Sequence, residues 1–148
     1  MLKVGERAPD FTVTLGSGER FTLSEHRGRN VVLFFYPRAF TLGCTAEVGG
    51  FRDHHDDLSI HNAVVIGIST DSVDRLKRFG DEVETPFGLG SDAAGEIRRL
   101  YDVQRRFGLG TSRVTYVIDG DGIIRDVFHN EVVMSSHVQN ALRKLESL

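Results

Sequence analysis

The 148-residue sequence predicts an α/β fold in which helices flank a mixed central sheet. Two predominantly apolar segments, at 31–36 and 63–69, have the composition of strands that are buried on both faces. A helical pattern follows each of them, and this alternation of strand and helix is typical of a parallel sheet. A hairpin and a last helix close the chain and add an antiparallel portion to the sheet. The length suits one domain spanning residues 1–148.

The amino-terminal residues predict a small hairpin that precedes the first buried strand. Residues 10–14 alternate between apolar and polar side chains, and a second short β-like segment occupies residues 20–23. Gly16 and Gly18 lie between them, and glycine tolerates the positive φ angles that tight hairpin turns require. We therefore expect a hairpin extension at the amino end of the sheet.

A helix is expected after the strand at 31–36. Five residues recur at spacings of four, three, four and three, and so mark one helical face: Cys44, Val48, Phe51, His55 and Leu58. Gly49 and Gly50 lie inside this pattern, and each weakens a helix by about 1 kcal/mol relative to alanine.

The second half of the chain supplies the remaining elements. After the strand at 63–69, Thr70 or Asp71 is expected to cap a helix. The segments that follow are a short helix near 94–101, strands at 113–118 and 123–128 joined by a turn at 119–122, and a last helix from Ser135 or Ser136.

Composition and charge exclude several classes of protein. The net charge is −3 and no Lys/Arg block is present, which argues against nucleic acid as a partner. No apolar stretch approaches the roughly 18 residues that a membrane span needs, and the amino terminus does not resemble a signal peptide. A single cysteine excludes an intrachain disulfide and a cysteine-rich zinc site. We expect a reducing, cytoplasmic setting.

Neither of two acidic or histidine-containing segments predicts a metal site. The run His54-His55-Asp56-Asp57 falls on the expected helix, where neighbouring side chains point apart. The turn at 119–122 resembles part of a calcium loop, but it lacks the downstream glutamate that such a loop requires.

Cys44 is the residue with the clearest chemical potential. It is expected in the first turn of a helix that follows a buried strand. Unpaired N–H groups and the helix dipole favour a negative charge there, and the thiolate is the nucleophilic form of cysteine.

The residues around Cys44 resemble the peroxiredoxin family. Pro37, Thr41 and Cys44 stand in the register Pro-x-x-x-Thr/Ser-x-x-Cys, which is that family's signature. The segment 67–71 also resembles the bacterioferritin-comigratory, or Q-type, branch of the family, and the segment 113–119 resembles the family segment that supplies an arginine to the active site. The resemblance implies a thioredoxin-like fold and a thiol-dependent peroxidase of hydrogen peroxide and organic hydroperoxides, without a cofactor or a metal.

The resemblance also implies roles for individual residues. Cys44 would be the nucleophile, Thr41 and Arg113 would orient and stabilise the reacting groups, and Pro37 would shield the pocket. Glu47 would hold Arg113 by a charge-assisted bond. We expect the ionised sulfur to lie beside the guanidinium at the mouth of a small cavity.

The chain departs from the Q-type pattern at Gly49, where many members carry a resolving cysteine. An oxidised Cys44 would therefore need an external thiol, as in a one-cysteine peroxiredoxin. Thioredoxin, glutaredoxin and a low-molecular-weight thiol all stay open as reductants. The sequence also leaves open whether the protein is a monomer or a homodimer. Two alternative functions remain: a redox sensor that relays oxidation of Cys44 to a partner, and a non-catalytic binding module.

Overall fold

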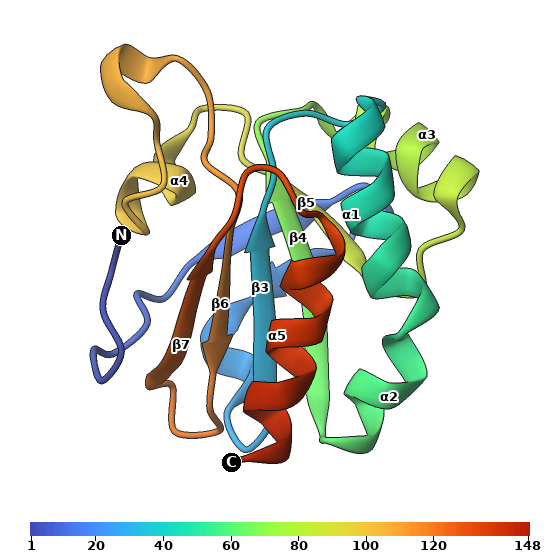
Figure 1. Cartoon of the computed structure of the whole chain (residues 1–148). Helices are drawn as coiled ribbons and strands as arrows, with labels where there is room; N and C mark the ends of the chain where they lie inside the picture. The colour runs from blue at the N-terminus through green and yellow to red at the C-terminus, as the bar shows by residue number, and fades with distance from the viewer.

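Seven strands form the sheet of the computed structural model, which describes residues 1–148: β1 (Thr12–Leu15), β2 (Arg20–Thr22), β3 (Asn30–Phe35), β4 (Ala63–Ser69), β5 (Gly88–Ser91), β6 (Val114–Ile118) and β7 (Ile124–His129). Their order across the sheet is β2-β1-β5-β4-β3-β6-β7 (Figure 1). The central pairs β3–β4 and β4–β5 are parallel, and all the other pairs are antiparallel. The predicted mixed sheet and the predicted amino-terminal hairpin are both confirmed.

Five α-helices accompany the sheet: α1 (Leu42–Asp53), α2 (His55–Ile60), α3 (Val73–Val83), α4 (Glu96–Leu100) and α5 (Ser135–Glu146). Short 3₁₀ turns occupy Leu23–His26 and Arg106–Gly108. Helices α1 and α5 lie side by side over one face of the sheet (Figure 1). No helix combines the length and the apolar character that crossing a bilayer would take.

The side chains of the sheet divide between two apolar cores, one on each face. The core under α1, α3 and α5 includes Phe34 and Phe51, whose rings stack with centroids 4.3 Å apart. Cys44 belongs to this core. The other core gathers Phe11, Tyr101 and their neighbours beneath the amino-terminal segment and α4. The strands between the cores are mainly apolar because both of their faces are covered.

Two helix boundaries differ from the prediction. The expected continuous helix from Cys44 to Leu58 is divided at His54, whose φ/ψ angles (−107°, 13°) are not helical. Helix α3 is capped by Ser72, whose side chain accepts a hydrogen bond from the Arg75 N–H, and not by Thr70 or Asp71. Ser72 and Asp71 are both good capping residues, so residue type alone did not separate them.

Strand β5 was not predicted, because its two glycines resemble a turn. Both glycines have a packing reason in the structure. A Cβ on Gly90 would lie 2.9 Å from a methyl carbon of Val13, and one on Gly88 would lie 2.9 Å from a methyl carbon of Leu15. The glycines therefore let β1 side chains pack directly on the backbone of β5.

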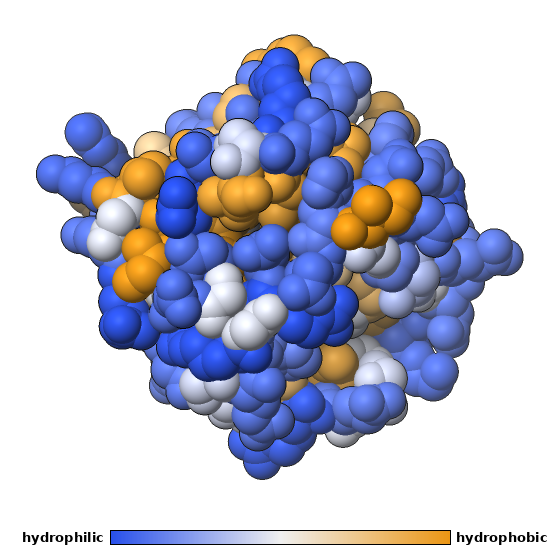
Figure 2. Space-filling model, turned by 90° about the horizontal axis from the view of Figure 1, so that it is seen from below, coloured by the Kyte–Doolittle hydropathy of each residue, from blue (hydrophilic) through white to orange (hydrophobic).

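The two ends of the molecule differ. The carboxyl ends of β3 and β4 and the first turn of α1 share the upper end in Figure 1. Figure 2 shows the opposite, lower end, which is mainly hydrophilic with separate hydrophobic patches.

Candidate active site

The pairing of β3 with β6 brings Cys44 and Arg113 to the same end of the sheet. The two strands are antiparallel, and Phe35, the last residue of β3, lies opposite Val114, the first residue of β6. Arg113 therefore enters the sheet where the chain leaves β3 for the loop that leads to Cys44. Two residues far apart in the sequence become neighbours through the register of one strand pair.

Cys44 lies in the first turn of α1, as predicted. Thr41 is the N-cap residue, with an extended backbone (φ −75°, ψ 153°). The backbone N–H groups of Leu42, Gly43 and Cys44 donate to no other group of the chain. Three free donors at a helix start are suited to stabilising a negative charge on sulfur or on a bound oxygen.

The guanidinium of Arg113 lies directly against this turn. A Cβ on Gly43 would come within 2.8 Å of Arg113 Nη2, so any other residue here would push the guanidinium aside. The Arg113 side chain is 11% exposed. Burial opposes its charge, but the Cys44 sulfur and the Glu47 carboxylate outweigh burial and raise the pKa of Arg113.

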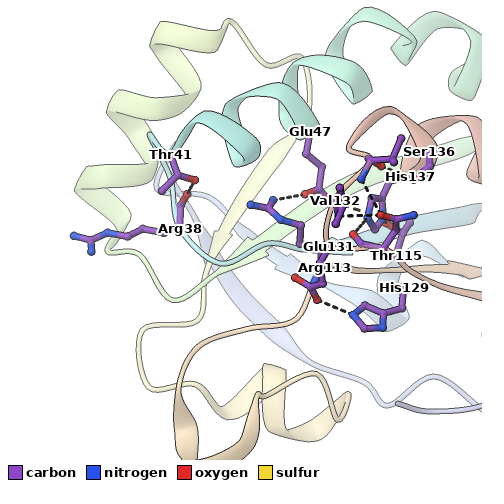
Figure 3. A network of polar contacts seen from close by, with 12 residues as sticks. Arg38, Thr41, Glu47, Arg113, Thr115, His129, Glu131, Val132, Ser136 and His137 are labelled. Carbon is purple, nitrogen blue, oxygen red and sulfur yellow. Dashed lines mark hydrogen bonds and ion pairs between the residues drawn. The ribbon is translucent and has the colours of Figure 1, made fainter.

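Glu47 anchors the arginine from one turn further along α1. Arg113 Nη1 donates to Glu47 Oε2 at 2.8 Å, which is the contact that the sequence led us to expect (Figure 3). Burial raises the pKa of Glu47 to about 7, although the bond to Arg113 works in the opposite direction. The second oxygen, Oε1, is buried and has no hydrogen-bond partner.

His137 of α5 completes the buried side of the site, and sequence reasoning missed it. His137 Nε2 lies 2.8 Å from the Asn130 carbonyl oxygen, which can only accept, so Nε2 carries a proton. Burial lowers the pKa of His137, so the neutral ring accepts from the Thr115 hydroxyl through Nδ1, at 2.8 Å. Nδ1 is 3.9 Å from Glu47 Oε1, too far for a hydrogen bond. The signal that could have found it is its spacing: His137 precedes Ala141 by four residues in the last helix, which puts both on one helical face.

Glu131 fixes the backbone of Arg113, and no sequence signal pointed to it. Its Oε2 accepts from the Arg113 N–H at 3.0 Å and from His129 Nε2 at 2.6 Å. Its Oε1 accepts from Arg105 Nη2 at 2.7 Å. Partial burial favours a higher pKa for Glu131, but these donors prevail and lower it.

Thr41 and Pro37 lie in the loop between β3 and α1. The Thr41 hydroxyl donates to the Arg38 carbonyl oxygen at 2.9 Å, and Figure 3 shows this pair apart from the cluster of Arg113 and Glu47. In this conformation the Thr41 hydroxyl therefore uses its single donor on the loop carbonyl, and only its lone pairs are left for another group. Pro37 is half-buried.

The sulfur is more enclosed than expected. Cys44 has 0% exposure, whereas we expected it at the mouth of a small cavity. Three surface cavities, of about 420, 730 and 250 Å³, lie elsewhere, and Cys44 lines none of them. Cys44 is packed within the apolar core under α1, α3 and α5, so the sulfur is covered in this conformation. No group of three or more His, Cys, Asp or Glu side chains is arranged to hold a metal ion.

Known proteins resemble this chain in sequence. Residues 4–127 match the model of the AhpC/TSA family. The chain belongs to this family. The sequence is 38% identical to the putative peroxiredoxin bcp of Coxiella burnetii, over 97% of this chain and 99% of the relative. It is 34% identical to peroxiredoxin Bcp of Bacillus subtilis, over 99% of this chain and 97% of the relative.

Solved structures of peroxiredoxins have the same fold. Peroxidoxin BcpB from Mycobacterium tuberculosis superposes with a TM-score of 0.93 at 35% identity, covering 100% of this chain and 99% of that one. The bacterioferritin comigratory protein of Xanthomonas campestris gives a TM-score of 0.87 at 27% identity, covering 93% of this chain and 90% of that one. The thioredoxin-like fold and the resemblance to the Bcp/Q branch are confirmed, and this peroxiredoxin carries a single cysteine.

Proposed function

We propose that this peroxiredoxin is a thiol-dependent peroxidase that reduces hydrogen peroxide and alkyl hydroperoxides. The observation that carries the proposal is the position of Cys44 at the free N–H groups of α1, beside a buried arginine that is paired with Glu47. The relatives named peroxiredoxin support it. Alkyl peroxide reduction is described for the related protein of Xanthomonas campestris.

The oxidative step uses the thiolate of Cys44. The sulfur attacks the terminal oxygen of R–O–O–H, so that an S–O bond forms as the O–O bond breaks. Cys44 becomes a sulfenic acid, and the departing RO⁻ takes a proton to give an alcohol, or water when R is hydrogen. Arg113 and the free N–H groups stabilise the charge on the leaving oxygen.

Three further residues would support this step. Glu47 holds Arg113 against the helix turn. Pro37 has no N–H and a fixed φ, and it shapes the loop wall near the sulfur. The Thr41 hydroxyl donates its hydrogen bond to the Arg38 carbonyl oxygen. Its lone pairs can therefore accept a hydrogen bond from the O–H of a peroxide.

The reductive step needs a thiol from outside the chain. One external thiol displaces water from the sulfenic acid and forms a mixed disulfide with Cys44. A second thiol then attacks the mixed disulfide, which restores the Cys44 thiol and releases the oxidised reductant as a disulfide. Thioredoxin, glutaredoxin and low-molecular-weight thiols are the candidate reductants, and turnover with each in turn distinguishes them.

The setting of the enzyme is part of the proposal. A sulfenic acid that depends on external thiols fits a reducing compartment such as the cytoplasm, and subcellular fractionation tests this. We propose that residues 1–148 act as one domain, because both ends of the chain contribute strands to one sheet. We also propose a monomer or a homodimer, and sedimentation velocity separates the two.

Peroxide consumption by stopped flow tests the activity. Cys44→Ser should abolish it with the circular dichroism spectrum unchanged, whereas Ala46→Ser, at an exposed position of the same helix, should not. Arg113→Ala should cost about 2–4 kcal/mol of transition-state stabilisation, as loss of an oxyanion donor does. A wild-type rate no faster than that of free cysteine would contradict the proposal and favour a binding module.

A further inference from the structure

An ion pair with a buried carboxylate binds the loop before Cys44 from outside the site described above. The pair consists of Asp71, which follows β4, and Arg75, in the first turn of α3. Arg75 Nε donates to Asp71 Oδ1 at 3.0 Å. The Asp71 side chain is only 5% exposed and that of Arg75 is 31% exposed. We refer to these two residues as the Asp71–Arg75 clasp.

The clasp holds both backbone groups of Ala39. The Ala39 N–H donates to Asp71 Oδ2 at 2.8 Å, and Arg75 Nη2 donates to the Ala39 carbonyl oxygen at 3.0 Å. The Ser69 hydroxyl donates to the same Asp71 oxygen at 2.7 Å, which fixes the carboxylate in place. Ala39 is completely buried. One residue of the loop is therefore bound on both sides by a pair that is itself anchored to β4 and α3.

The next residue, Phe40, has a backbone conformation that needs external support. Its φ is +67°, in the left-handed region that side chains other than glycine rarely adopt. Arg75 Cζ lies 4.9 Å from the centroid of the Phe40 ring, and the Phe79 ring centroid lies 5.1 Å from it. The arginine that binds Ala39 thus also covers the strained residue.

Phe40 lies immediately before the start of α1. Thr41, the N-cap residue, follows Phe40 directly, and Cys44 lies within the first turn. With the loop held in this way the sulfur has 0% exposure. An external thiol must reach that sulfur in the reductive step, so the loop has to yield before reduction takes place.

We propose that Asp71 and Arg75 are positioning residues with opposite effects on the two half-reactions. The closed clasp aligns the first turn of α1 for the attack on peroxide, and its release exposes the oxidised sulfur to the reductant. This inference rests on the proposed function. It requires that loosening the clasp slow the first half-reaction and speed access to the sulfur.

Arg75→Ala is the first test, with two separate readouts. The second-order rate with hydrogen peroxide should fall about 10-fold, because the reacting groups lose alignment. Labelling of Cys44 by 5,5′-dithiobis(2-nitrobenzoate), a bulky disulfide, should rise about 10-fold in the native protein, because local opening becomes easier. Lys77→Ala is the matched control, since Lys77 lies on the same helix and pairs only with Asp81 at 3.2 Å.

Val31→Ala controls for a general loss of stability, because Val31 belongs to the core on the other face of the sheet. Faster labelling in Arg75→Ala than in Val31→Ala, compared at equal free energy of unfolding, supports the clasp. Equal labelling in these two variants overturns the proposal. The proposal is also overturned if Arg75→Ala matches Lys77→Ala both in the rate with hydrogen peroxide and in the rate of Cys44 labelling. If Arg75→Ala does not fold, Asp71→Asn replaces it, because asparagine still accepts from Ala39 but loses the charge that binds Arg75.

The labelling readout keeps the two proposals apart. A wild-type protein that fails to consume peroxide overturns the proposed function, whereas the comparison of Cys44 labelling still decides whether the clasp holds the loop.

Discussion

Gly43 and Arg113 approach each other so closely that a side chain at Gly43 would displace the guanidinium: a Cβ there would lie 2.8 Å from Arg113 Nη2. The backbone of the helix turn and the guanidinium are therefore in direct contact beside Cys44. Contact of this kind lets a fixed positive charge and free N–H donors stabilise negative charge at the same place beside the sulfur.

Gly43→Ala should lower the rate of the peroxide step. The added methyl group displaces the guanidinium, and a misplacement of this order costs about 10- to 100-fold in rate. Alanine is the better helix former, so a weakened helix would not account for the loss. Stopped-flow measurement of peroxide consumption gives the rate, and a value within twofold of wild type would show that the arginine does not need this contact.

Gly49→Ala should leave the peroxide step unchanged and slow the reductive step. A Cβ at Gly49 has Arg52 Nη2, at 3.8 Å, as its only neighbour, so alanine fits without strain. It should stabilise α1 by up to about 1 kcal/mol and make fraying of the helix more costly. Single-turnover kinetics resolve the two half-reactions, and equal effects on both would count against a role for helix opening in reduction.

Glu47→Gln should remove a pH dependence of stability. Burial raises the pKa of Glu47 from its usual 4.5 to about 7, so between these values the folded protein binds this proton more tightly than the unfolded chain. The free energy of unfolding therefore falls as the pH rises through this window, by roughly 3 kcal/mol for a shift of this size.

Urea unfolding at pH 5 and at pH 7.5 measures this dependence in both proteins. The wild type should lose more stability over the interval than Glu47→Gln. The same loss in both would mean that the Glu47 carboxyl does not titrate as its burial suggests.

Thr41→Val should slow the peroxide step about 10-fold, the size of the effect when one hydrogen bond to substrate is lost. Thr41→Ser keeps the hydroxyl and should retain most of the rate. Because the wild-type hydroxyl donates to Arg38, both variants also need a check of the loop by thermal unfolding. If valine and serine give the same rate, the hydroxyl acts on the loop conformation and not on the peroxide.

The central part of the fold and of the site was predictable because it depends on local patterns. The apolar runs of β3 and β4 predict that both strands are buried, and the spacing of Pro37, Thr41 and Cys44 predicts the position of the thiol. The pairing of Glu47 with Arg113 followed from the resemblance, not from periodicity. Its geometry depends on the register of β3 against β6, which the sequence does not display.

The remaining polar contacts involve partners that are distant in the sequence. His137 was not predicted, because the sequence does not show which groups a histidine on an apolar helix face will contact. Glu131 looks like an ordinary loop carboxylate and Asp71 like a helix cap, and only the fold shows that Glu131 binds the backbone of Arg113 and Asp71 that of Ala39. Such long-range pairing of a side chain with a backbone group has no characteristic spacing.

The lone sulfur has a consequence for the lifetime of this peroxiredoxin. A chain without a second cysteine has no internal thiol with which to trap its sulfenic acid as a disulfide. Each oxidised molecule is thus exposed to a kinetic competition, in which a reductant restores it or another hydroperoxide carries it irreversibly to the sulfinic acid. The number of turnovers before inactivation is then set by the ratio of thiol to peroxide in the surroundings.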